Sequence, residues 1–288
     1  MQPPLPSITP TWHNDSYDAI SPARPELSAA GKTVVVVGAG SGIGRETALA
    51  FADAGAARVI LLGRTEAAIA ETAASLPQTV NSDVFAADIT SEESLVKVAA
   101  TIGQWDILVL TAGYVSTPSP IVGSSTDEWW QSFETNTKGT YLVTKAFLPT
   151  ANPSHAAVIA LTTGTTALPA AAVLGLSAYM ASKLAQTKII EFLAAENPNL
   201  FAVTLHPGMV ETDIFKKSGA KAEALPMDKA RLPAHFAVWL SSPEAEFLNG
   251  RTVWANWDVE ELKSSAQATQ SGQLLTSGIN GWPYSNLV

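Results

Sequence analysis

Tyr179 and Lys183 are the residues whose types and spacing point most directly to chemistry. They lie in a stretch of helical composition, and side chains four residues apart share one face of an α-helix, with Cβ atoms about 5–6 Å apart. A tyrosine hydroxyl, with a pKa of about 10, is a poor acid-base group near neutral pH, but a lysine ammonium beside it favours the ionised form. The pair therefore predicts a tunable proton donor. Because Tyr-x-x-x-Lys is common by chance, a surface pair without function is the alternative interpretation.

A glycine-rich segment lies between a predicted strand at 33–37 and a predicted helix at 43–54. Glycines let the backbone approach a phosphate closely, and a helix N-terminus presents free N–H groups to an anion. The spacing is Gly-x-x-x-Gly-x-Gly rather than the stricter Gly-x-Gly-x-x-Gly, so a glycine-rich turn without a ligand is the alternative. The residues assigned to this phosphate-binding loop are Gly38, Gly40, Ser41, Gly42, Ile43 and Gly44.

Arg64 follows the second predicted strand, at the position that selects between nicotinamide cofactors. An acid there accepts a hydrogen bond from the ribose 2′-hydroxyl of NAD, whereas an arginine accommodates the 2′-phosphate of NADP. A guanidinium can bind a phosphate through two charge-assisted hydrogen bonds. Arg64 therefore predicts NADP(H) as the cofactor, with NAD(H) less favoured, and a solvated surface arginine is the alternative.

The elements that must position these residues alternate regularly between strand and helix. Such alternation is typical of βαβ units, with a parallel sheet and helices on both faces. We predict a single-domain α/β Rossmann fold at 31–258, with a doubly wound parallel sheet of about seven strands. An extended N-terminal arm at 1–30 precedes it, and a tail at 259–288 packs on the domain or on a neighbouring subunit. The predicted strands are 33–37, 58–62, 84–87, 106–110, 157–161, 201–205 and 252–255, and the predicted helices are 43–54, 65–76, 91–102, 127–148 and 178–195.

Composition limits the classes of function. The 288 residues carry 17 Lys and Arg against 26 Asp and Glu, a net charge of −9, which argues against nucleic acid or an anionic membrane as a partner. The absence of cysteine excludes disulfides, thiolate metal sites and cysteine nucleophiles. The four histidines lack ligand spacing, so no metal site is predicted. Without a secretory signal or a run of 18 apolar residues, the chain is predicted to be a soluble cytoplasmic protein.

Taken in sheet order, these features resemble the classical short-chain dehydrogenase/reductase family over residues 31–258. Asp88 matches the family's adenine-contacting aspartate, and Asn136 matches the asparagine of its catalytic tetrad. The turn at 207–212 matches the one that holds the nicotinamide. The resemblance implies that the cofactor is also bound by Ala112, Gly113, Tyr179, Lys183, Pro207, Gly208, Val210 and Thr212.

The chain departs from the family pattern at the catalytic serine, which is replaced by the threonine run at 162–166. A threonine hydroxyl can donate the same hydrogen bond, although its methyl group restricts the rotamer. The strand-end position selects Thr163, whereas Thr166, 13 residues before Tyr179, fits the family spacing better. We predict Thr163. Leu110 and Thr111 also stand where the family has two asparagines.

The resemblance implies an NADP(H)-dependent oxidoreductase that moves a hydride between nicotinamide and a carbonyl or alcohol of a small substrate. Tyr179 is expected to transfer the proton, Lys183 to lower its pKa and hold the ribose, and Asn136 to position a relay water. A lid at 209–232 mixes apolar and basic residues and suits a largely apolar molecule. The family's assembly mode implies a homodimer or homotetramer. A non-redox isomerase, dehydratase or cyclase, and a non-catalytic NADP-binding protein, are the alternatives.

Overall fold

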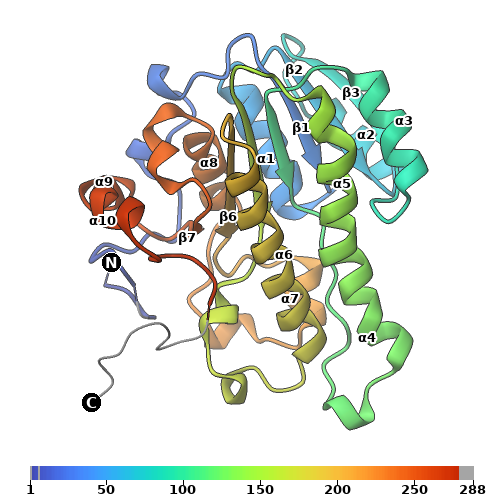
Figure 1. Cartoon of the computed structure of the whole chain (residues 1–288), viewed down its shortest axis with the longest axis vertical. Helices are drawn as coiled ribbons and strands as arrows, with labels where there is room; N and C mark the ends of the chain where they lie inside the picture. The colour runs from blue at the N-terminus through green and yellow to red at the C-terminus, as the bar shows by residue number, and fades with distance from the viewer. Residues whose placement is uncertain (1, 6, 279–288) are drawn as a thin grey trace.

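Seven parallel strands form one sheet in the computed structural model, which describes residues 2–5 and 7–278 (Figure 1). Their order is β3-β2-β1-β4-β5-β6-β7, so the connections run in opposite directions on either side of β1 and β4. The predicted Rossmann sheet is confirmed, and ligands bind such sheets at the carboxyl ends of the strands beside this reversal. The strands are β1 (Thr33–Val37), β2 (Arg58–Gly63), β3 (Asn81–Ala86), β4 (Ile107–Leu110), β5 (Ala156–Leu161), β6 (Leu200–His206) and β7 (Thr252–Trp254).

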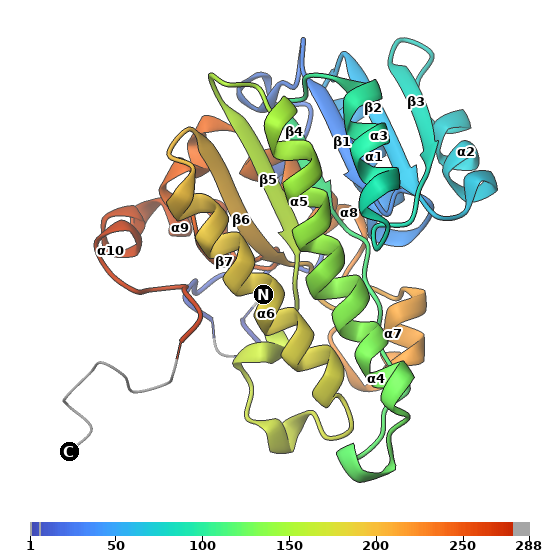
Figure 2. The same ribbon diagram turned by 45° about the vertical axis from the view of Figure 1, so that its right-hand side comes forward.

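Helices cover both faces of the sheet. One core cluster joins one side of the sheet to α1, α8 and α9, and a second joins the other side to α3, α5 and α6. Figure 2 shows α5 and α6 lying side by side across one face. This burial on both faces explains the continuous apolar runs of the central strands. The helices are α1 (Gly42–Asp53), α2 (Glu66–Ala74), α3 (Glu92–Ile102), α4 (Thr126–Phe133), α5 (Gly139–Phe147), α6 (Ser177–Glu196), α7 (Asp213–Lys217), α8 (Arg231–Leu240), α9 (Val259–Ser264) and α10 (Ala266–Ser271).

Two features of the helices differ from the expectation. The continuous helix predicted at 127–148 is interrupted, because a π-helical turn at Glu134–Lys138 separates α4 from α5. A π turn keeps a helical backbone and changes only the hydrogen-bond register, so composition does not reveal it. Helix α8, which packs along α1, has no counterpart among the predicted helices. In the described part of the chain, no helix combines the length and apolarity required to cross a membrane.

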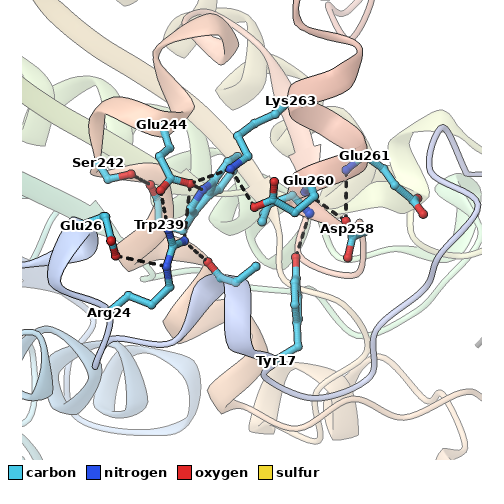
Figure 3. A network of polar contacts seen from close by, with 12 residues as sticks. Tyr17, Arg24, Glu26, Trp239, Ser242, Glu244, Asp258, Glu260, Glu261 and Lys263 are labelled. Atoms are coloured by element: carbon cyan, nitrogen blue, oxygen red, sulfur yellow. Dashed lines mark hydrogen bonds and ion pairs between the residues drawn. The ribbon is translucent and has the colours of Figure 1, made fainter.

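The N-terminal arm is mostly irregular, with two short 3₁₀ turns. Trp12, Ile20 and Leu27 nevertheless belong to the same buried cluster as α8 and α9. Polar contacts tie the arm to the C-terminal third of the domain (Figure 3). Arg24 donates to Glu244 over 2.6 Å, and the Tyr17 hydroxyl accepts from the amide of Val259 over 3.0 Å. The arm is therefore integrated into the packed domain.

The tail at 259–288 begins with α9 and α10. Val259 and Leu262 on α9 are buried in the cluster that also contains the arm residues. The backbone amide of Thr252 donates to the carbonyl of Leu275 over 2.8 Å, so the described part of the tail packs on its own chain. Residues 279–288, which include Trp282, Pro283 and Tyr284, lie outside the described residues.

Candidate active site

A cavity of about 860 Å³ lies where the strands end, from Gly38 after β1 to Trp254 at the end of β7. The segments that line it follow six different strands and are far apart in the sequence. Of the site residues predicted from sequence, Asn136 alone does not line this cavity. Those that do are Gly38, Gly40, Ser41, Gly42, Ile43, Gly44, Arg64, Asp88, Ala112, Gly113, Thr163, Tyr179, Lys183, Pro207, Gly208, Val210 and Thr212.

In the glycine loop, backbone segments approach each other so closely that a side chain would not fit between them. A Cβ atom on Gly38, whose φ is +95°, would lie 2.6 Å from the amide nitrogen of Ala112, and one on Gly44 would overlap the carbonyl of Gly38. The N-cap residue of α1, Ser41, makes no side-chain cap hydrogen bond. The first-turn N–H groups of a 12-residue helix are thus left for another acceptor beside the cavity. This arrangement fits a phosphate-containing cofactor.

Arg64 and Asp88 lie at the same end of the cavity. Asp88 accepts from the amide and the hydroxyl of Thr90, both over 2.8 Å. These bonds, with a smaller contribution from the charge of Arg64, lower the pKa of Asp88, so its carboxylate is ionised at neutral pH. Within residues 2–5 and 7–278, no carboxylate forms an ion pair with the exposed Arg64, and its guanidinium is available to an anionic ligand.

Tyr179 and Lys183 extend from the first turns of α6. The Lys183 ammonium donates to the carbonyl of Leu161 over 2.8 Å and to the side chain of Gln186 over 2.9 Å. Burial raises the pKa of Tyr179 to about 12 and lowers the pKa of Lys183 to about 7. The expected lowering of the tyrosine pKa by the lysine is therefore not seen, because desolvation outweighs the effect of a neighbour that is itself poorly solvated.

Asn136 lies in the π turn, with its side chain fully buried. Its Oδ1 accepts from the amide of Tyr114 over 2.8 Å, and its Nδ2 donates to the Tyr114 carbonyl and to Ser182 Oγ over 2.8 and 2.9 Å. A Cβ atom on Gly113 would lie 3.5 Å from Asn136 Oδ1 and 3.6 Å from Lys183 Nζ. Asn136 thus lies directly behind the cavity wall and connects α6 to the loop after β4. π turns are frequent at functional sites.

The threonine run divides into hydroxyls that face different neighbours. Thr162 Oγ1 lies 3.0 Å from Thr187 Oγ1 in the interior, and Thr166 Oγ1 donates to the carbonyl of Thr163 over 2.8 Å. Thr163 Oγ1 lies 2.7 Å from Thr165 Oγ1, and both residues line the cavity, whereas Thr166 does not. Thr162 also lines the cavity, but its hydroxyl is bonded to Thr187, so Thr163 and Thr165 are the members whose hydroxyls pair with each other in the cavity wall.

The family model described as short chain dehydrogenase matches residues 32–223, which hold the glycine loop and the Tyr179–Lys183 pair. The chain belongs to the short-chain dehydrogenase/reductase family. It is 37% identical to a short chain dehydrogenase/reductase of Claviceps purpurea over 286 residues, which cover 96% of this chain and 95% of the relative.

Solved structures agree with this short-chain dehydrogenase fold. A Shigella flexneri protein complexed with NADP has a TM-score of 0.72 and 22% identity, covering 81% of this chain and 99% of its own. A 7α-hydroxysteroid dehydrogenase complexed with NADH and 7-oxo glycochenodeoxycholic acid also has a TM-score of 0.72, with 23% identity, covering 83% of this chain and 96% of its own. At these identities both comparisons speak to the fold alone.

Asp228 does not line the cavity of this dehydrogenase, but it supports the turn at 207–212, a role that the sequence did not reveal. Its buried carboxylate accepts from the amide of Met209 over 2.6 Å, from Asn14 Nδ2 over 2.7 Å and from Asn256 Nδ2 over 3.0 Å. It thereby holds the turn at 207–212 against the N-terminal arm. Its partners come from three distant segments, so no local spacing could identify it.

We expect Asp228→Asn to lower the melting temperature. All three partners of the carboxylate are N–H donors, so the new NH₂ group must face at least one of them. An unmet hydrogen bond of a buried group costs about 1–3 kcal/mol, or roughly 2–10 °C for a domain of this size. Thermal unfolding by circular dichroism measures the shift. Asn14→Ala, which removes one of the three contacts, should have a smaller effect, and an unchanged melting temperature in Asp228→Asn would refute the bracing role.

Proposed function

We propose that the chain is an NADP(H)-dependent oxidoreductase that transfers a hydride between nicotinamide C4 and the carbonyl or alcohol carbon of a small, largely apolar organic molecule. The observation that carries this proposal is a single cavity lined by both the glycine loop and the Tyr179–Lys183 pair. The first part suits a phosphate-containing cofactor, and the second supplies a proton donor in the same enclosed space.

The preference for NADP(H) over NAD(H) rests on Arg64, which lines the cavity at the end of β2 and pairs with no carboxylate of the described residues. Asp88 and the Pro207–Thr212 turn contribute the adenine and nicotinamide ends of the cofactor site. Gly113 lines the cavity beside Lys183 Nζ, where the ribose would lie. When bound, the nicotinamide supplies or accepts the hydride.

The chain's own residues move the proton and orient the reacting carbonyl. Tyr179 donates a proton to the oxygen as the carbonyl is reduced, and accepts it in the reverse direction. Lys183 holds the ribose. Asn136 braces the loop after β4 against α6 from behind the cavity wall, and because its amide is bonded to Tyr114 and Ser182 we assign it no relay water. The hydroxyl of Thr163 donates a hydrogen bond to the carbonyl oxygen, with Thr165 Oγ1 as its partner 2.7 Å away. Such positioned acid-base transfer contributes about 10²- to 10⁴-fold to the rate.

The direct test is the oxidation of NADPH, followed by its absorbance, over a panel of aldehydes and ketones. Turnover of at least one apolar carbonyl compound is expected, because the substrate half of the cavity is mainly apolar. A non-redox enzyme of the same fold, and a protein that only binds the cofactor, both predict no oxidation with any member of the panel. Apolar and sulfur-containing residues lining that half are Leu168, Leu176, Met180, Ile214, Phe215 and Leu225.

Arg64→Asp should shift the cofactor preference from NADPH toward NADH. The change replaces a cation that binds the 2′-phosphate by a carboxylate that repels it and accepts from a ribose hydroxyl. The loss of a hydrogen bond to a charged group corresponds to about 1.5–3 kcal/mol, or roughly tenfold to 150-fold in affinity for NADPH. The ratio of kcat/KM for the two cofactors measures the shift. The control is Lys32→Asp, because among the described residues Lys32 pairs with no carboxylate and does not line the cavity, whereas Arg45 and Lys97 pair with Glu71 and Glu93. An unchanged ratio would make Arg64 a solvated surface residue.

We also propose a cytoplasmic homodimer or homotetramer whose contacts involve α5 and α6. These helices lie side by side on one face (Figure 2) and expose Tyr141, Leu184 and Phe192. Large apolar side chains gathered on a surface are typical of protein contacts. A second copy of the chain would cover them, and sedimentation velocity of the wild type and of Phe192→Glu would detect the association and its loss.

A further inference from the structure

His206 is a buried imidazole in the cavity wall that the proposed reaction does not use. It ends β6, directly before the Pro207–Thr212 turn, and its residue surface is only 6% exposed. It lines the cavity, and within the described residues neither ring nitrogen has a hydrogen-bond partner. Nδ1 is enclosed by protein, whereas Nε2 is not, so Nε2 is the nitrogen that a ligand can reach. Leaving a buried polar group unsatisfied costs free energy, so such a group in a cavity wall indicates a polar atom supplied by a ligand.

Aromatic packing holds His206 in place. The edge of its ring meets Trp254 with centroids 4.5 Å apart, and Trp254 stacks on Trp257 at 5.8 Å. Gly164 is required beneath this pair, because a Cβ atom there would lie 2.7 Å from His206 Cδ2 and would overlap the Trp254 ring. The imidazole is therefore a fixed part of the cavity wall, beside Thr163, rather than a side chain that turns away to solvent.

The imidazole that a ligand meets is in its neutral form. Burial lowers the pKa of His206 to about 3, so at physiological pH the ring presents one N–H donor and one acceptor. A charged ligand group would gain no ion pair from a neutral ring. A hydroxyl group suits it best, because a hydroxyl both donates and accepts and can pair with either tautomer.

We propose that His206 recognises a hydroxyl group of the substrate other than the one at the reacting carbon. The indole of Trp254, which lines the cavity beside His206, and the apolar lining favour an aromatic skeleton for the molecule that carries this hydroxyl. The substrate class is thus a hydroxylated aromatic ketone or the corresponding alcohol. The redox part of this statement rests on the proposed function, but the recognition of the hydroxyl does not.

The test compares the binding of 2-naphthol and naphthalene to the full chain by tryptophan fluorescence, with no turnover required. We expect wild type to bind 2-naphthol at least about tenfold more tightly, the gain of one satisfied hydrogen bond in an apolar site. His206→Phe keeps an aromatic ring beside Trp254 and should abolish the preference while leaving naphthalene affinity nearly unchanged. His206→Gln, which retains a donor and an acceptor, should restore part of it. The matched control is His155→Phe, because His155 is exposed and does not line the cavity.

Two results would overturn the proposal. One is equal affinity of the wild type for both probes, a result that does not depend on whether any variant folds. The other is a folded His206→Phe variant that keeps the preference for 2-naphthol. A second measurement separates this proposal from the redox function: NADPH oxidation with 6-hydroxy-2-tetralone and with 2-tetralone. Absence of turnover with both would count against the redox function, while the binding ratio would still decide the role of His206.

Discussion

Tyr179→Phe is expected to lower kcat by about 10²- to 10⁴-fold, the contribution of a positioned acid-base group. The hydroxyl forms no hydrogen bond within residues 2–5 and 7–278, so its removal leaves no protein partner unsatisfied. The ring that fills the cavity wall is retained. Affinity for NADPH should therefore remain nearly unchanged, and steady-state kinetics combined with cofactor binding would separate the two effects.

Tyr141→Phe is the matched control for this substitution. Tyr141 lies on α5, is exposed and does not line the active-site cavity, so the same chemical change there should leave kcat unaltered. If Tyr179→Phe instead abolished cofactor binding at unchanged kcat, Tyr179 would have a structural role, and the proton donor would have to be sought elsewhere in the cavity.

The second large effect is expected for Thr163→Val, which should lower kcat by about 10²- to 10³-fold, the usual effect of removing one donor to a developing oxyanion. The 2.7 Å contact with Thr165 explains how the hydroxyl can serve. Thr165 Oγ1 can donate to Met180 Sδ, 3.2 Å away, or to Thr163 Oγ1, and when it donates to Thr163 the Thr163 proton is free to point at a carbonyl oxygen. Valine keeps the β-branched shape, so the variant should fold, with a modest loss of stability because Thr163 caps a 3₁₀ turn.

Thr166→Val is the control, since the Thr166 hydroxyl donates to the carbonyl of Thr163 and does not line the cavity. We expect its kcat to fall by much less than that of Thr163→Val. Parallel determination of kcat and melting temperature for the two variants decides between them. A crippled Thr166→Val with an active Thr163→Val would mean that the 13-residue spacing to Tyr179 was the better guide.

Sequence reasoning worked where one local pattern determines the structure. The continuous β-branched run at 33–37 is typical of a strand buried on both faces, and β1 has the predicted limits. The helix predicted at 178–195 differs from α6 by one residue at each end. The third strand begins three residues earlier than predicted, at Asn81, because β3 is an edge strand whose first residues are polar and exposed.

The remaining features depend on contacts between distant segments. Asp228 meets Asn14 across 214 positions of sequence, and His206 meets Trp254 only because β6 and β7 are neighbours in the sheet. The pKa of Tyr179 depends on how deeply the finished fold buries the ring, which a spacing of four residues cannot report. Chemical roles could thus be expected from sequence, whereas the residues that support them could not.

The N-terminal arm has a consequence for the synthesis of the chain. Its contacts join segments that are synthesised far apart in time: Thr11 bonds to Glu261 across 250 positions. At 5–20 residues per second, about 10 to 50 s separate the two. During that interval Trp12, Ile20 and Leu27 have no completed core to enter, so their apolar surface stays exposed on the growing chain. The contact between the arm and α9 can form only after residue 261 has been synthesised.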